Sequence, residues 1–247
     1  MINSRQLVVL TRPAGENEAL ASRLQENNLN VLSRPLIALS DIGVSAESKQ
    51  QAIDLEHNDI IIFVSKSAVR FGMPLLDQYW PAWPLSLEWY AVGEGTADAL
   101  NGFDVSARYP EIAGSEGLLA LKGLAEVEGK KILIARGQGG RELLASALGA
   151  RGGLVRYFET YRRDAVKYDD WVLPRDRTIV VLTSGEIVEH FVDQVGAMFG
   201  HVHLIVPSSR IGDKARALGA AKLTITAGAS EQALYDAVLN ECGILDG

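Results

Sequence analysis

The sequence is poor in the residues that build disulfides and metal centres. One cysteine, Cys242, is present among 247 residues, so no disulfide can form within the chain and a cysteine-based metal site would lack ligands. No apolar run reaches the roughly 18 residues that a membrane helix needs. The first ten residues also lack the charged-then-apolar layout of a signal peptide. We therefore expect a soluble cytoplasmic protein with no metal site.

Positive charge is scarce as well. Lys and Arg number 24 against 31 Asp and Glu, which gives a formal net charge of −7. This balance argues against a broad electrostatic surface for nucleic acid. An acidic protein can still bind an anion if cations and backbone N–H groups gather locally, so a small-molecule partner is expected.

The motifs of nucleotide-binding and nucleophilic enzymes are missing. The glycine pairs that begin at Gly93 and Gly137 lack the third glycine of the dinucleotide fingerprint, and no Walker lysine follows either pair. The four histidines complete no metal-ligand spacing with carboxylates. Ser65 and Ser184 have no histidine at a predictable neighbouring strand end, so a catalytic triad is not supported.

What the chain does contain is a series of short apolar runs, each followed by a small or polar cluster and then a helical pattern. The runs are Leu7–Leu10, Ile60–Val64, Trp89–Val92, Ile132–Ala135, Ile179–Leu182 and Leu204–Val206. Continuous hydrophobicity is typical of parallel strands covered on both faces. Ser184 is a natural N-cap for a helix whose apolar stripe begins at Ile187. The pattern predicts an α/β fold with doubly wound parallel sheets.

Three pairs of similar segments recur in the same order in the two halves of the chain. They are Arg12–Leu24 with Arg136–Leu148, Phe63–Val69 with Leu182–Val188, and Gly114–Leu119 with Ala229–Leu234. The pairs suggest that a unit of about half the chain was duplicated.

Two segments without a helical stripe, 33–43 and 156–166, occupy equivalent places in the two halves. If each half begins in one lobe and ends in the other, these segments would run side by side as a two-stranded linker. The expected lobes are then 1–34 with 166–247, and 43–155, with linkers at 35–42 and 156–165. Two lobes in simple succession remain the alternative.

The functional signal lies where the predicted strands end, because open α/β sheets bind ligands outside the carboxyl edges of their strands. These ends carry hydroxyls, glycines and cations at helix starts, where unpaired N–H groups and the helix dipole favour anions. The candidate binding residues are Arg12, Ser65, Lys66, Gly93, Thr96, Arg136, Gly137, Arg141, Thr183, Ser184, Ser208, Ser209 and Arg210.

Any one of these turns can be explained without a ligand, since a serine or threonine before a helix is a cap that contributes about 1 kcal/mol. Repetition favours binding: six strand ends share the pattern, and four carry a guanidinium or ammonium that capping does not need. The set predicts a receptor for a small polycarboxylate. Tyr161 lies on the second connector, where it either packs or donates a proton to a leaving group.

Taken together, these motifs resemble the uroporphyrinogen-III synthase family over nearly the whole chain. The likeness runs through Leu10–Pro13, Phe63–Val69, Ala91–Ala97, Gly114–Leu118, Ala135–Gly137 with Gly140 and Arg141, Glu159–Arg162, Leu182–Gly185 and Pro207–Arg210. Each motif alone is weak, and their order, spacing and completeness are specific. Val64 stands where many relatives have threonine, so that hydroxyl contact is not expected.

The resemblance implies two α/β lobes on a two-stranded linker and a lyase without a cofactor. Nothing in the sequence demands more than a monomer. Its implied substrate is hydroxymethylbilane, a linear tetrapyrrole with eight carboxylates, which loses water and closes with its last pyrrole inverted, through a spiro intermediate. Tyr161 would be the linker tyrosine that assists departure of the hydroxyl. Ser65, Thr96, Ser184 and Ser208 would contact carboxylates.

Two other functions remain open from the sequence. A hinged, non-enzymatic polycarboxylate-binding module would share the lobes and the polar turns. A nucleotide-dependent α/β enzyme would share the fold class.

Overall fold

The computed structural model describes residues 6–140 and 142–244. In these ranges the strands are β1 (Leu7–Leu10), β2 (Asn30–Ser33), β3 (Ile37–Asp41), β4 (Ile60–Phe63), β5 (Glu88–Ala91), β6 (Lys131–Gly137), β7 (Leu154–Ala165), β8 (Thr178–Val181), β9 (His203–Val206) and β10 (Lys222–Ile225). The helices are α1 (Glu18–Glu26), α2 (Ala46–Ile53), α3 (Lys66–Asp77), α4 (Glu94–Asn101), α5 (Ser115–Leu119), α6 (Leu143–Ala150), α7 (Gly185–Val195), α8 (Ser209–Ala217) and α9 (Glu231–Glu241). Short 3-10 helices are η1 (Leu55–His57), η2 (Lys122–Leu124) and η3 (Gly196–His201).

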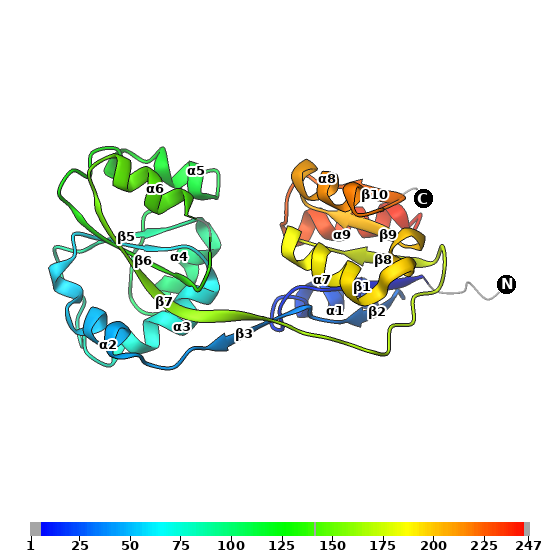
Figure 1. Ribbon diagram of the computed structural model, residues 1–247, viewed down its shortest axis with the longest axis horizontal. Helices are drawn as coiled ribbons and strands as arrows, with labels where there is room; N and C mark the ends of the chain where they lie inside the picture. Colours follow the sequence, from blue (N-terminus) through cyan, green and yellow to red (C-terminus); the bar gives the residue numbers. More distant parts are fainter. Residues whose placement is uncertain (1–5, 141, 245–247) are drawn as a thin grey trace. The chain divides into compact units, whose positions relative to one another are not determined.

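The chain divides into two compact units (Figure 1). Unit 1 contains residues 1–38 and 164–247, and unit 2 contains residues 39–163. In all three pairs of similar segments, one member lies in unit 1 and the other in unit 2. The chain passes from one unit to the other near β3 and again near the end of β7, and these two strands are hydrogen-bonded neighbours in the sheet of unit 2.

Each unit is built on a five-stranded sheet. The order is β10-β9-β8-β1-β2 in unit 1 and β3-β7-β6-β4-β5 in unit 2. All four neighbouring pairs in unit 1 are parallel, and so are β7-β6, β6-β4 and β4-β5 in unit 2. The predicted class, two α/β lobes with doubly wound, mostly parallel sheets, is confirmed. All six predicted strands are present within a residue or two of their expected bounds.

Burial explains why the strands are apolar without interruption. All four residues of β4 are fully buried. Ile61 and Phe63 pack in the core on the side of α3 and α4, whereas Ile60 and Ile62 pack in a second core with residues of α5 and α6. Because side chains alternate across a strand, a sheet covered on both faces needs apolar residues at every position.

Unit 1 follows the same principle. Val8 and Leu10 of β1 pack with Leu20 of α1 and Leu234 of α9, and α7 and α8 cover the other face of the sheet (Figure 1). Within the residues that the structure describes, no helix has the length and apolarity to cross a bilayer.

Candidate functional site at the strand ends

The predicted turns of unit 1 meet at one edge of its sheet. They follow β1, β8 and β9, which are adjacent parallel strands, so their carboxyl ends lie side by side. This edge carries Arg12, Thr183, Ser184, Ser208, Ser209 and Arg210. Thr11 holds β1 and β8 together at this level, because its buried hydroxyl donates to the Val181 carbonyl over 2.6 Å.

Unit 2 gathers its own predicted residues in the same way. Two of its turns follow β4 and β5, and Arg136 and Gly137 are the last residues of β6. Tyr161 lies on β7, and these four strands are neighbours. The edge carries Ser65, Lys66, Gly93, Thr96, Arg136, Gly137 and Tyr161. Arg141 lies outside the described residues. Each unit therefore brings its predicted residues to the carboxyl edge of its own sheet.

Three of the predicted serines are N-caps, as the sequence indicated. Ser65 Oγ accepts the Ala68 N–H over 3.0 Å, Ser184 Oγ accepts the Ile187 N–H over 3.2 Å, and Ser208 Oγ accepts an N–H at 3.5 Å. A hydroxyl that accepts such a bond still has its own proton to donate. Capping and binding of a carboxylate are therefore compatible at each serine.

Thr96 differs from the serines because its side chain does not cap a helix. It lies in the first turn of α4 and is 5 % exposed. Its hydroxyl makes no hydrogen bond to any residue in the described ranges. Every fully enclosed side-chain polar atom of those ranges has a partner, so this hydroxyl oxygen is not fully enclosed. The hydroxyl is thus open to a ligand at the start of α4.

The predicted cations fall into two kinds. Lys66 and Arg210 are exposed, and no acidic group of the described chain lies within ion-pair distance of either. Arg12 is half-buried and donates to the Ala229 carbonyl over 2.5 Å; burial lowers the pKa of its guanidinium, and Glu16 and Glu231 oppose that shift. Each unit thus presents an exposed cation at its edge, Lys66 in unit 2 and Arg210 in unit 1.

Arg136 is the most enclosed of the four described cations. It is 3 % exposed, its guanidinium carbon lies 4.3 Å from the centre of the Tyr157 ring, and its Nη1 donates to Glu142 over 3.2 Å. Tyr157 also donates to Glu142, and this bond, followed by that from Arg136, lowers the pKa of Glu142. The guanidinium of Arg136 is therefore held by Tyr157 and Glu142 and is little exposed.

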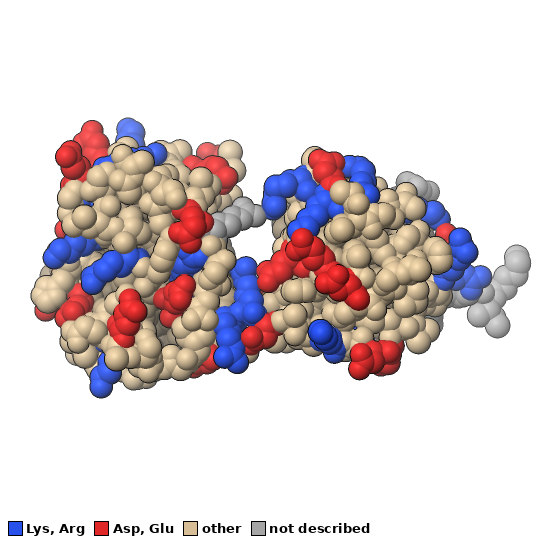
Figure 2. Space-filling view, viewed as in Figure 1, with Lys and Arg blue, Asp and Glu red and all other residues tan. Residues whose placement is uncertain are grey.

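Lys214, which the sequence analysis did not select, also approaches this edge in unit 1. A Cβ added to Gly185, the first residue of α7, would lie 3.1 Å from Lys214 Cδ. Lys214 Nζ pairs with Glu189 over 2.5 Å. Figure 2 shows basic side chains over α8, the helix that carries Arg210, Lys214 and Arg216. A search for basic residues in the first two turns of the helix after each strand would have found Lys214.

Tyr161 is buried at the edge of unit 2. It is 2 % exposed, its ring stacks on Phe71 with centroids 5.5 Å apart, and its hydroxyl lies 3.3 Å from Ser65 Oγ. The ring therefore packs in the core and the hydroxyl reaches the strand-end turns, while the role of proton donor stays a prediction.

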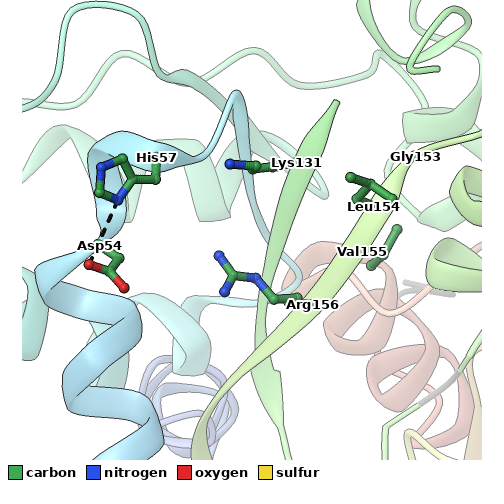
Figure 3. A pocket seen from close by; sticks show the side chains of 7 residues that line it. All are labelled: Asp54, His57, Lys131, Gly153, Leu154, Val155 and Arg156. Carbon is green, nitrogen blue, oxygen red and sulfur yellow. Dashed lines mark ion pairs between the residues drawn. The ribbon is translucent and has the colours of Figure 1, made fainter. Parts of the chain in front are cut away.

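A cavity of about 760 Å³ opens elsewhere in unit 2. It is lined by Asp54, His57, Lys131, Gly153, Leu154, Val155 and Arg156 (Figure 3). Lys131 and Leu154 are the first residues of β6 and β7, so the cavity lies at the amino ends of these strands. None of the predicted site residues lines it. We therefore place the candidate site at the carboxyl edges instead.

Metal binding has no structural support in the part of the chain that is described. There, no group of three or more His, Cys, Asp or Glu side chains could hold a metal ion. His203 begins β9, at the amino edge of the sheet, where it contacts Thr224 and Glu241.

The comparisons with known proteins agree on one family. Residues 18–236 match the family model described as uroporphyrinogen-III synthase HemD. The uroporphyrinogen-III synthase of Escherichia coli K12 is 34 % identical, with 94 % of this chain and 99 % of that protein covered. The enzyme of Salmonella typhimurium LT2 is 35 % identical at the same coverage.

Solved structures show the same fold. A uroporphyrinogen-III synthetase from Helicobacter pylori superposes with a TM-score of 0.66 at 16 % identity, and a mutant uroporphyrinogen III synthase from Thermus thermophilus with 0.65 at 15 %. Both comparisons cover 96 % of this chain and 99 % of the other. The family model and the two bacterial relatives extend over both units, and the chain belongs to the uroporphyrinogen-III synthase family.

Proposed function

We infer that the chain cyclises hydroxymethylbilane to uroporphyrinogen III, with inversion of the terminal pyrrole and loss of water. It would act as a lyase in tetrapyrrole biosynthesis and, through it, in haem biosynthesis. The observation that carries this inference is the match to named uroporphyrinogen-III synthases at 34–35 % identity over 94 % of the chain. We further propose that the enzyme acts as a monomer in the cytoplasm.

The strand-end residues suit a substrate with eight carboxylates. One anionic group would need one helix start, whereas this chain supplies a set of hydroxyls and an exposed cation at each of two sheet edges. We propose that substrate carboxylates engage Ser65, Lys66 and Thr96 at the edge of unit 2, and we propose the same role for Ser184, Ser208 and Arg210 at the edge of unit 1. Charge-assisted bonds from these groups would select one conformer of the chain-like substrate.

The residues that bound the linker between the lobes are also a proposal. We propose residues 35–42 and 156–165 as the linkers between lobe 1, residues 1–34 and 166–247, and lobe 2, residues 43–155. The hydrogen-bonded pairing of β3 and β7 supports a two-stranded linker, although β7 also pairs with β6 from Leu154 to Tyr161.

The reaction needs few acid or base groups from the protein. The nitrogen of the pyrrole that carries the hydroxymethyl group can push an electron pair toward that carbon and break the carbon–oxygen bond, and the departing hydroxyl needs one proton to leave as water. Tyr161 is proposed to donate that proton, because its phenol lies among the strand-end turns. The last pyrrole then bonds to the carbon that lost the hydroxyl, through the spiro intermediate, and the proton released from the α carbon of that pyrrole restores the phenol.

Ser65 would hold the phenolate that this transfer leaves. One lone pair of its oxygen accepts the Ala68 N–H, and its single proton can turn from a substrate carboxylate to the tyrosine oxygen 3.3 Å away once the phenolate forms. A hydroxyl at a helix start is suited to this role because the helix dipole favours negative charge there.

An isomer assay tests the reaction itself. The protein is incubated with freshly made hydroxymethylbilane, and the porphyrins formed after oxidation are separated by isomer. The inverted isomer III should dominate over the symmetrical isomer that forms without an enzyme. A protein that only binds polycarboxylates would leave the symmetrical isomer alone, and that result would refute the proposed activity.

Tyr161→Phe tests the proton donor. The substitution keeps the ring and its packing on Phe71, so the protein should fold with an unchanged unfolding midpoint. Turnover should fall several-fold, because the pyrrole nitrogen still drives departure of the hydroxyl when the phenol is absent. An unchanged kcat would remove Tyr161 from the chemistry without affecting the assignment of the reaction.

A further inference from the structure

The ladder between β6 and β7 is irregular next to Tyr161. Arg136 pairs with Glu159 and Gly137 pairs with Tyr161, so one residue of β7, Thr160, has no opposite partner on β6. Thr160 Oγ1 donates to the Arg136 carbonyl over 3.3 Å, and the ladder resumes where the Gln138 N–H donates to the Tyr161 carbonyl over 2.8 Å. This is a β-bulge, a feature that redirects side chains near active sites.

The bulge decides which face of the sheet Tyr161 occupies. Phe158 and Thr160 both face α3, since a Cβ added to Gly72 of that helix would lie 3.2 Å from Phe158 Cε1 and 2.9 Å from Thr160 Cγ2. In a regular strand the next side chain would point to the opposite face. Tyr161 instead shares a core with Phe158 and stacks on Phe71 of α3. The extra residue therefore brings its hydroxyl to Ser65.

Gly137 makes room for the redirected ring. A Cβ at this position would lie 2.6 Å from Tyr161 Cε2 and 2.7 Å from Cζ, well inside van der Waals contact. The ring cannot retreat easily, because it is 2 % exposed and Phe71 stacks on it. Gly137 is not among the glycines with positive φ, so space and not backbone conformation requires a glycine here.

We propose that Gly137 is a positioning residue for Tyr161: together with the bulge at Thr160, its missing side chain fixes the phenol beside Ser65. This inference rests on the proposed role of Tyr161 as proton donor. Room for the Tyr161 ring, and not direct contact with the substrate, is then the reason for a glycine at this strand end. A side chain at position 137 would act on catalysis through the tyrosine.

A double-mutant cycle tests the proposal. Gly137→Ala, Tyr161→Phe and the double variant are compared with the wild-type protein by kcat, KM and thermal unfolding. Gly137→Ala should lower kcat by about the same several-fold factor as Tyr161→Phe and leave KM within about twofold. In the Tyr161→Phe background it should lower kcat no further, because there is no hydroxyl left to misplace. The unfolding midpoint should fall equally in both backgrounds, since both rings meet the added methyl group.

Two further variants keep the test decisive if Gly137→Ala folds poorly. Thr160→Ala removes the bond to the Arg136 carbonyl without adding volume, and it should lower kcat about twofold only when Tyr161 is present. Gly149→Ala is the matched control, because an added Cβ there meets no atom within 4 Å, and it should change neither kcat nor KM.

The possible failures can be told apart. An equal loss of kcat in both backgrounds, or no loss from Gly137→Ala, overturns the positioning role. A rise in KM in both backgrounds does the same and points to direct substrate contact by Gly137. A wild-type kcat in Tyr161→Phe refutes the proton donor itself, which is a failure of the proposed function.

Discussion

Ser184 offers a way to separate helix capping from substrate binding at a single position. Its hydroxyl caps α7 by accepting the Ile187 N–H over 3.2 Å, and the residue is partly exposed at the edge of unit 1. Replacement by alanine removes both functions at once, so its effect cannot be assigned. Replacement by asparagine or by aspartate keeps an oxygen that can cap the helix, and these two variants differ from each other mainly in charge.

The stability changes follow from the cap. Ser184→Ala should cost about 1 kcal/mol, or about 2–4 °C in the unfolding midpoint of a chain of this size. Asparagine and aspartate cap helices about as well as serine, so both variants should stay within about 0.5 kcal/mol of wild type. Aspartate gains further from the helix dipole, which favours negative charge at a helix start.

Substrate affinity should separate the same two variants in the opposite direction. Two negative charges about 4 Å apart repel by about 1 kcal/mol in water and about 4 kcal/mol at the effective dielectric near a protein surface. If a substrate carboxylate binds at this turn, Ser184→Asp should raise KM at least about fivefold. Ser184→Asn should raise it little, because an amide can still donate to a carboxylate.

The assay is initial-rate kinetics with hydroxymethylbilane beside thermal unfolding of each variant. A low salt concentration is needed, since salt screens an exposed charge. A stable Ser184→Asp protein with the KM of Ser184→Asn would show that no carboxylate binds there. The turn after β8 would then be a cap alone.

Two predictions concern groups outside the site. Burial raises the pKa of the Cys242 thiol to about 11. Iodoacetamide at pH 8 should therefore label the native protein about 100-fold more slowly than the urea-unfolded chain, as measured by mass spectrometry. Equal labelling rates would contradict the burial of this thiol. Partial burial acts to raise the pKa of Glu88, but hydrogen bonds from Tyr90 and Lys130 and the charge of Arg108 lower it overall. Because the folded-state pKa is depressed, Glu88→Gln should be less stable than wild type by about 0.5–1 kcal/mol above pH 5, and chemical denaturation should show this difference shrinking below about pH 4. A pH-independent difference would place the effect in packing.

Local patterns in the sequence were sufficient for the apolar strands and for the cap at Ser184. The six apolar runs became strands because a strand covered on both faces must be apolar throughout, and that requirement is visible without knowing its neighbours. Capping by Ser184 was equally local, since the bond spans three residues. β2 and β10 were not predicted: each is four residues long, contains no fully buried residue and lies at the edge of its sheet.

Only the tertiary structure could decide how the site residues are held. Arg136 and Lys66 look alike in the sequence as cations at strand ends, yet contacts with Tyr157 and Glu142 enclose the first, while the second remains exposed. The face occupied by Tyr161 depends on one unpaired residue in the ladder with β6, a strand that begins 30 residues earlier. Residue type and order specify which groups reach a sheet edge, whereas burial, pairing and the direction of a side chain depend on partners that are distant in the sequence.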